Sequence, residues 1–100
     1  MSIENYKYYP SFTAFLSAYN LIENTYMTNK GKTLETDDPS FSEAFFYCYD
    51  YLNSLKKEEL DILKSDINMH CKITMFDTIK LDIITRNPSL LHLPGMLKIF

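Results

Sequence analysis

The chain has 100 residues, of which 46% are hydrophobic and 23% charged, with a formal net charge of −3 and a pI of about 5.2. This length predicts one domain spanning residues 1–100, with enough apolar side chains for a core that needs no metal or disulfide. The acidic balance argues against nucleic acid as a partner, because phosphate binding requires a basic surface. The sequence also lacks an apolar run long enough to cross a membrane, and its first ten residues do not resemble a secretory signal, so we expect a cytoplasmic protein.

The first predicted helix covers residues 11–27. Pro10 and Ser11 indicate its start, with Ser11 expected as the N-cap, and Gly31 follows its end. The apolar residues recur at intervals of three and four, which is typical of one buried helix face. This face consists of Phe12, Phe15, Leu16, Tyr19, Ile22 and Tyr26.

A second helix is predicted after the polar connector 33–38. It begins either at Pro39, which fits a first turn, or with Ser40 and Glu43 as a capping box. At about 100° per residue, one side of this helix forms a core stripe. The stripe contains Phe41, Ala44, Phe45, Cys48, Leu52 and Leu55, and Tyr49 and Tyr51 flank it.

A third helical stripe is predicted from Leu60, Leu63, Ile67 and Cys71. Cys48 and Cys71 leave open one disulfide, but the lack of an evident secretory signal favours a reducing compartment, where both are expected to behave as small buried hydrophobes.

Residues 73–86 fit two patterns. Phe76, Ile79 and Ile83 have helical spacing, whereas the alternation of Ile79, Leu81 and Ile83 with charged residues suits a strand. We predict a helix, because no second segment offers a clear strand to pair with. The fold class is therefore all-α, a small single-domain bundle of about four helices, and the alternative is an α+β fold with a strand or hairpin in 73–86. The apolar tail after Pro88 is expected to dock on the core as short helical turns.

Residue patterns for catalysis are missing from the sequence. His70 and Cys71 are adjacent, so on a helix they point about 100° apart and do not form a nucleophile–base pair. Spacings typical of metal ligands or of phosphate-binding glycine loops are absent, and the chain has 2 glycines. We therefore expect a binding protein that is not an enzyme and uses neither metal nor cofactor.

A candidate binding surface lies between Thr33 and Leu55. This stretch contains acids but no Lys or Arg, and such a surface suits a basic partner. In the helical projection Phe46 and Tyr47 fall away from the core stripe, on the side of Glu43 and Asp50. Either another helix of the bundle covers these aromatics or they serve as interface anchors. The candidate partner-binding residues are Glu35, Asp37, Asp38, Glu43, Phe46, Tyr47 and Asp50.

The N-terminal pattern Tyr9-Pro10-Ser11-Phe12, followed by Phe15-Leu16 and Tyr19, resembles the opening of small immunity proteins from bacterial contact-dependent growth inhibition systems. The acidic start of the middle helix and the segment LKKEELDILKSDI also resemble that family, as do the chain length and the Asn/Ile/Lys/Tyr-rich composition. The chain departs from the family pattern in having no Trp.

This resemblance implies a cytoplasmic protein that binds a cognate toxin domain, often a nuclease, and occludes its active site or substrate groove. The resemblance gives no residue of this chain a catalytic role. The alternative function is a small helical adaptor or regulator that acts by homodimerisation or by binding another protein.

Overall fold

The computed structural model describes residues 10–28 and 39–100; residues 1–9 and 29–38 lie outside this description. The described chain forms four α-helices and one short 3-10 helix and contains no strand. These elements are α2 (Pro10–Thr28), α3 (Pro39–Ser54), α4 (Lys57–Lys64), α5 (Ile67–Arg86) and η1 (Pro88–His92). The all-α prediction is confirmed, and the ambiguous residues 73–86 are helical.

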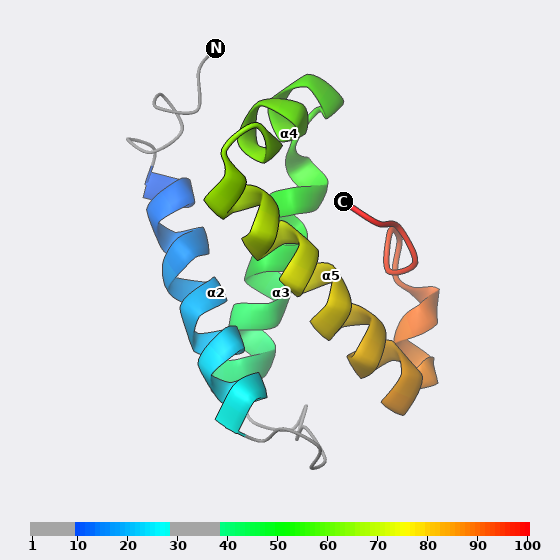
Figure 1. The fold of residues 1–100 in the computed structure, drawn as a ribbon. Helices are drawn as coiled ribbons and strands as arrows, with labels where there is room; N and C mark the ends of the chain where they lie inside the picture. The colour runs from blue at the N-terminus through cyan, green and yellow to red at the C-terminus, as the bar shows by residue number, and fades with distance from the viewer. Residues whose placement is uncertain (1–9, 29–38) are drawn as a thin grey trace.

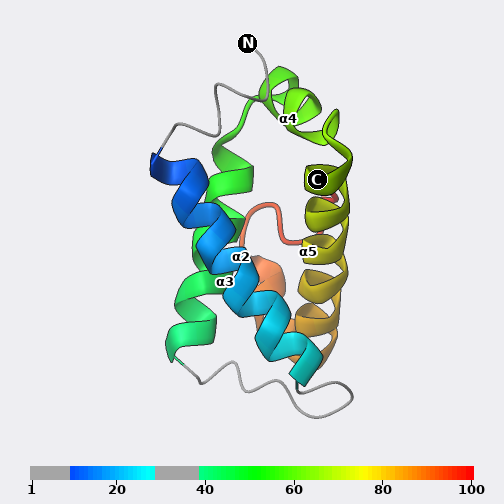
Figure 2. The same ribbon diagram turned by 60° about the vertical axis from the view of Figure 1, so that its left-hand side comes forward.

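Helices α2 and α3 pack side by side and antiparallel, while α4 caps one end of the bundle and α5 runs back along it (Figures 1 and 2). η1 follows the far end of α5, and the tail after it returns between α3 and α5 (Figure 2). Three hydrogen bonds anchor this tail: Asn53 Nδ2 donates to the Pro94 carbonyl at 3.3 Å, the Phe100 N–H donates to Asp77, and Lys80 Nζ donates to the Lys98 carbonyl. The expectation that the apolar tail docks on the core is therefore confirmed.

Aromatic rings from different elements fill the core between the helices. Phe15 of α2 stacks on Tyr51 of α3 with ring centroids 4.7 Å apart. Phe76 of α5 stacks on Phe45 of α3 at 5.5 Å and also contacts Phe100 of the tail at 6.4 Å. Burial of such rings is the main favourable contribution to folding, so Phe76 links three elements through one side chain.

The helix boundaries follow local sequence signals with one exception. α2 begins at Pro10, so Ser11 lies inside the helix and its expected role as N-cap is wrong. Proline suits this first position because its missing N–H would have no partner within the helix. Pro39 begins α3 in the same way. Asp66 caps α5 by accepting hydrogen bonds from the Asn68 and Met69 N–H groups.

The third predicted stripe is only half correct. Leu63 is buried and Leu60 packs on the core, but Ile67 is 76% exposed and Cys71 is also exposed. The reason is the break at Ser65 and Asp66, which ends α4 and starts α5 with a new phase. A continuous projection across this break therefore assigns the wrong face to α5, whose inner side instead carries Met69, Ile73, Phe76, Ile79, Ile83 and Ile84.

A buried ion pair holds the C-terminal tail against α5. Lys80 is 0% exposed; its Nζ lies 3.6 Å from Asp77 Oδ1, donates to the Lys98 carbonyl and lies 4.4 Å from the centroid of the Phe100 ring. The Asp77 carboxylate accepts the Phe100 N–H at 3.1 Å. Burial raises the pKa of Asp77, although the Phe100 N–H and Lys80 oppose this shift, and burial lowers the pKa of Lys80 against the attraction of Asp77.

Candidate functional site

The outer face of α3 presents three of the residues singled out from the sequence. Glu43, Tyr47 and Asp50 follow one another at intervals of four and three residues, and all three are exposed. This spacing places them on one side of a helix. Glu35, Asp37 and Asp38 belong to the same acidic stretch of sequence but lie outside the described residues.

Tyr47 borders a groove between α2 and α3 with a volume of about 370 Å³. The residue is 38% exposed, and its hydroxyl donates to the Ser11 carbonyl of α2 at 3.4 Å. Leu21 and Glu43 also line this groove, and Leu21 is exposed to the same extent as Tyr47. The remaining lining residues are small, which leaves the groove open: Ala14, Ser17, Ala18, Ser40 and Ala44. We call this groove, together with Asp50, the α2–α3 face.

The charge on this side of the molecule has one sign. Neither α2 nor α3 contains Lys or Arg, and the α2–α3 face carries the exposed carboxylates of Glu43 and Asp50. Glu23 of α2 lies on the other side of its helix, where it accepts a hydrogen bond from the Tyr19 hydroxyl. All described basic residues lie at position 56 or later, in or beside α4, α5 and the tail. The α2–α3 face is therefore a negative surface that attracts basic groups.

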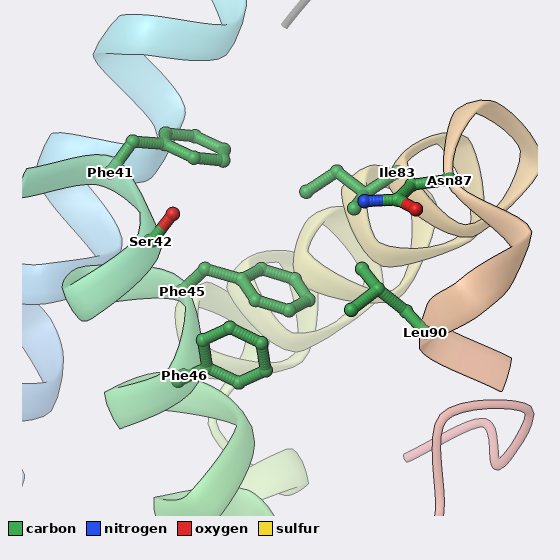
Figure 3. Close-up of a pocket in the computed structure, with 7 residues that line it drawn as sticks. All are labelled: Phe41, Ser42, Phe45, Phe46, Ile83, Asn87 and Leu90. Atoms are coloured by element: carbon green, nitrogen blue, oxygen red, sulfur yellow. The ribbon is translucent and has the colours of Figure 1, made fainter. Parts of the chain in front are cut away.

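Phe46 does not share this face. Its side chain is half-buried and packs edge-on against Phe45, at 5.2 Å between centroids, and against Tyr49, at 6.4 Å. It lines a different pocket, of about 240 Å³, between α3 and the junction of α5 with η1 (Figure 3). The sequence left open whether the bundle covers Phe46 and Tyr47 or leaves them exposed. The bundle covers much of Phe46 and leaves Tyr47 exposed.

The sequence did not predict the groove or the pocket, because each forms only where α3 packs against another secondary-structure element. The groove needs the small residues of α2 opposite Ser40 and Ala44 of α3. The pocket needs Ile83, Asn87 and Leu90 opposite α3. The small residues at positions 14, 17 and 18, on the side of α2 away from its aromatic stripe, were the available signal for the groove.

The described residues show little sign of nucleophilic or metal chemistry. In residues 10–28 and 39–100 no three His, Cys, Asp or Glu side chains gather closely enough to hold a metal ion. Both cysteines are free thiols; Cys48 is buried and Cys71 exposed, which corrects the expectation that both are buried. Burial raises the pKa of Cys48 to about 12, so at neutral pH it is a thiol with little nucleophilic character.

We expect iodoacetamide to modify Cys71 rapidly in the folded protein and Cys48 only after unfolding. The thiolate is the reacting species, and Cys48 combines a raised pKa with a buried sulfur. Mass spectrometry of tryptic peptides after timed alkylation measures both rates, and the Cys71→Ser variant isolates Cys48. Rapid labelling of Cys48 in native buffer would contradict its position in the core.

Comparisons of the chain with protein-family models, with curated proteins and with solved structures find no match. Among the helices of the described chain, none combines the length and the apolar character that crossing a membrane requires.

Proposed function

We propose that this protein is an immunity protein that binds and neutralises a cognate bacterial toxin domain, with the α2–α3 face as its contact surface. The observation that carries the proposal is an open groove bordered by an exposed tyrosine and carboxylates, on two helices without a Lys or Arg. The resemblance of the N-terminal pattern to immunity proteins of contact-dependent growth inhibition systems supplies the class of partner, and a cytoplasmic location belongs to the same proposal.

The groove supports binding of a protein rather than catalysis. Tyr47 presents a rigid ring with only two rotatable side-chain angles, so little conformational entropy is lost when a partner covers it. Tyrosine is among the residues that most often dominate interface energies. The small side chains of the groove admit a protruding side chain of the partner beside this ring.

The charge of the face supports a basic partner. Nucleases carry positive surfaces because they bind phosphates. The carboxylates of Glu43 and Asp50 would take the positions that substrate phosphates occupy on the nuclease. The proposal also includes Glu35, Asp37 and Asp38, because they belong to the acidic stretch of sequence that precedes α3. Phe46 is not included, because its half-buried ring belongs to the core side of α3.

The adaptor alternative, in which the protein forms a homodimer through this face, has less support. A symmetric dimer would bring Glu43 and Asp50 of one copy towards the same two residues of the other, without a basic residue from α2 or α3. Like charges facing one another across an interface are unfavourable. The negative surface therefore favours a different protein as partner.

The test uses the toxin candidate encoded by the neighbouring gene. Expression of its toxic domain should arrest bacterial growth, and co-expression of this protein should restore it. With purified proteins, Tyr47→Ala should weaken binding by about 30-fold or more, the loss of about 2 kcal/mol that defines a hot spot. The double variant Glu43→Gln/Asp50→Asn should chiefly slow association and reduce its dependence on salt, both measurable by surface plasmon resonance.

Two control variants match these changes on the other side of the molecule. Asp61→Asn removes an exposed carboxylate of α4, and Leu81→Ala truncates a side chain of α5 that is 42% exposed, close to the exposure of Tyr47. Both should bind the toxin as the wild type does. Unchanged binding by the α2–α3 variants contradicts the assigned face, and failure to rescue growth contradicts the proposed function itself.

A further inference from the structure

The pocket between α3 and the junction of α5 with η1 has a floor and a rim of different character. Phe41, Phe45 and Ile83 are buried and form the floor, while Phe46 and Leu90 are half-buried and form part of the rim (Figure 3). Solvent therefore reaches the pocket past the rim, and the side chains of the floor are apolar. The two polar lining residues are Ser42 and Asn87.

The size and the rings of the pocket limit what can enter it. Its volume is about 240 Å³. A cavity of about 150 Å³ in another protein takes up benzene, so this pocket has room for one ring with a small substituent. Three phenylalanine rings line one side, and aromatic rings favour stacked or edge-to-face contacts with another ring.

The charge of the pocket excludes ionised ligands. Among the described residues that line it, none is Asp, Glu, Lys, Arg or His. An ion would lose its hydration here without gaining a charged partner, which is strongly unfavourable. The ligand is therefore neutral.

Asn87 adds one directional group. The Ser89 hydroxyl donates to Asn87 Oδ1 at 2.6 Å, which fixes the orientation of the carboxamide. Figure 3 shows its nitrogen turned towards the rings of α3. A carboxamide nitrogen is a donor, so it pairs with an acceptor on the ligand. Ser42 already takes part in another interaction and is given no role.

We propose that this pocket binds a neutral molecule with a single aromatic ring and one hydrogen-bond acceptor, held between the phenylalanines of α3 and the carboxamide of Asn87. The site is separate from the α2–α3 face, since Phe46 and Tyr47 leave the helix about 100° apart. The proposal therefore does not depend on the immunity function.

Acetophenone and ethylbenzene form a matched pair of probes, because they share a ring and a two-carbon substituent and differ by the carbonyl acceptor. We expect acetophenone to bind about 5- to 10-fold more tightly, the effect of one hydrogen bond of about 1 kcal/mol. Titrations followed by ¹H–¹⁵N NMR should shift the Asn87 side-chain amide signal with acetophenone and leave it nearly unchanged with ethylbenzene. Equal affinities and equal shifts would overturn the role of Asn87.

A pocket-filling variant tests the location. Leu90→Phe places a larger ring at the rim and should abolish binding, whereas Leu91→Phe, at a residue of η1 that is 44% exposed and does not line the pocket, should bind acetophenone normally. Thermal unfolding of both variants shows that they are folded. Acetophenone binding to Leu90→Phe with wild-type affinity, or no NMR shift at any pocket residue of the wild type, would overturn the proposal.

Discussion

Lys80→Met should lower the free energy of unfolding by about 3–5 kcal/mol, because it leaves the buried Asp77 carboxylate without its positive partner. The same change removes the hydrogen bond to the Lys98 carbonyl and the contact with the Phe100 ring. Urea unfolding followed by circular dichroism measures the loss. We expect the tail to be the part most affected, since both charged groups bond to its backbone.

A double-mutant cycle separates the pair from its surroundings. Asp77→Leu/Lys80→Met, compared with both single variants, places two apolar side chains where the charges were. It should recover the part of the loss in Lys80→Met that comes from the unpaired Asp77 charge, but not the stability lost with the hydrogen bonds to the tail. The matched control is the solvent-accessible pair Arg86–Asp82, whose side chains are 35% and 27% exposed, with 3.2 Å between Nε and Oδ1 on the same helix. Arg86→Met should cost no more than about 1 kcal/mol. Equal effects of Lys80→Met and Arg86→Met would contradict a buried ion pair.

The loss in Lys80→Met should depend on pH with a definite sign. Burial already raises the pKa of Asp77 in the wild type, and the positive charge of Lys80 opposes this shift. Lys80→Met removes that charge, so the pKa of Asp77 should rise further. A carboxyl with a raised folded pKa binds protons more readily in the folded state, so stability falls as pH rises through that pKa. Lys80→Met should therefore regain part of its stability in mildly acidic buffer. A variant that becomes still less stable relative to the wild type on acidification would contradict this assignment.

Phe76→Ala should destabilise the fold by about 3–5 kcal/mol, the range for removing a fully buried aromatic ring. The ring is 0% exposed and contacts both Phe45 and Phe100, so its loss opens a cavity where three elements meet. Ile67→Ala on the same helix should change stability by less than about 0.5 kcal/mol, since Ile67 is largely exposed. Thermal and urea unfolding compare the two variants. A large loss in Ile67→Ala would restore the original prediction that this residue is part of the core.

Much of the helical architecture could be predicted from local patterns. The inward faces of α2 and α3 are correct because, apart from Leu55 just after α3, each lies within one uninterrupted helix, where an interval of three or four residues returns to the same side. Phe76, Ile79 and Ile83 were placed correctly for the same reason. The error at Ile67 and Cys71 arose where a projection was carried across a helix break.

Only part of the candidate site could be predicted from the helical pattern. The projection put Glu43, Tyr47 and Asp50 on the outer side of α3, and they are exposed there. It grouped Phe46 with them, although that ring lies near the edge of the apolar sector, where the position of neighbouring elements decides burial. η1 and α5 supply those neighbours through Leu90 and Ile83.

The sequence by itself determined the class of fold, the inner faces of single helices and the absence of basic residues from α2 and α3, because these depend on composition and on intervals of a few residues. Only the tertiary structure decided which outward residues stay exposed, where the groove and the pocket lie, and that Lys80 and Asp77 are buried together under the tail. The physical reason is that burial of a given side chain depends on elements distant in sequence. In the sequence, Lys80 has the pattern of an ordinary surface lysine. In the structure it is covered by Phe100, which lies 20 residues further along the chain.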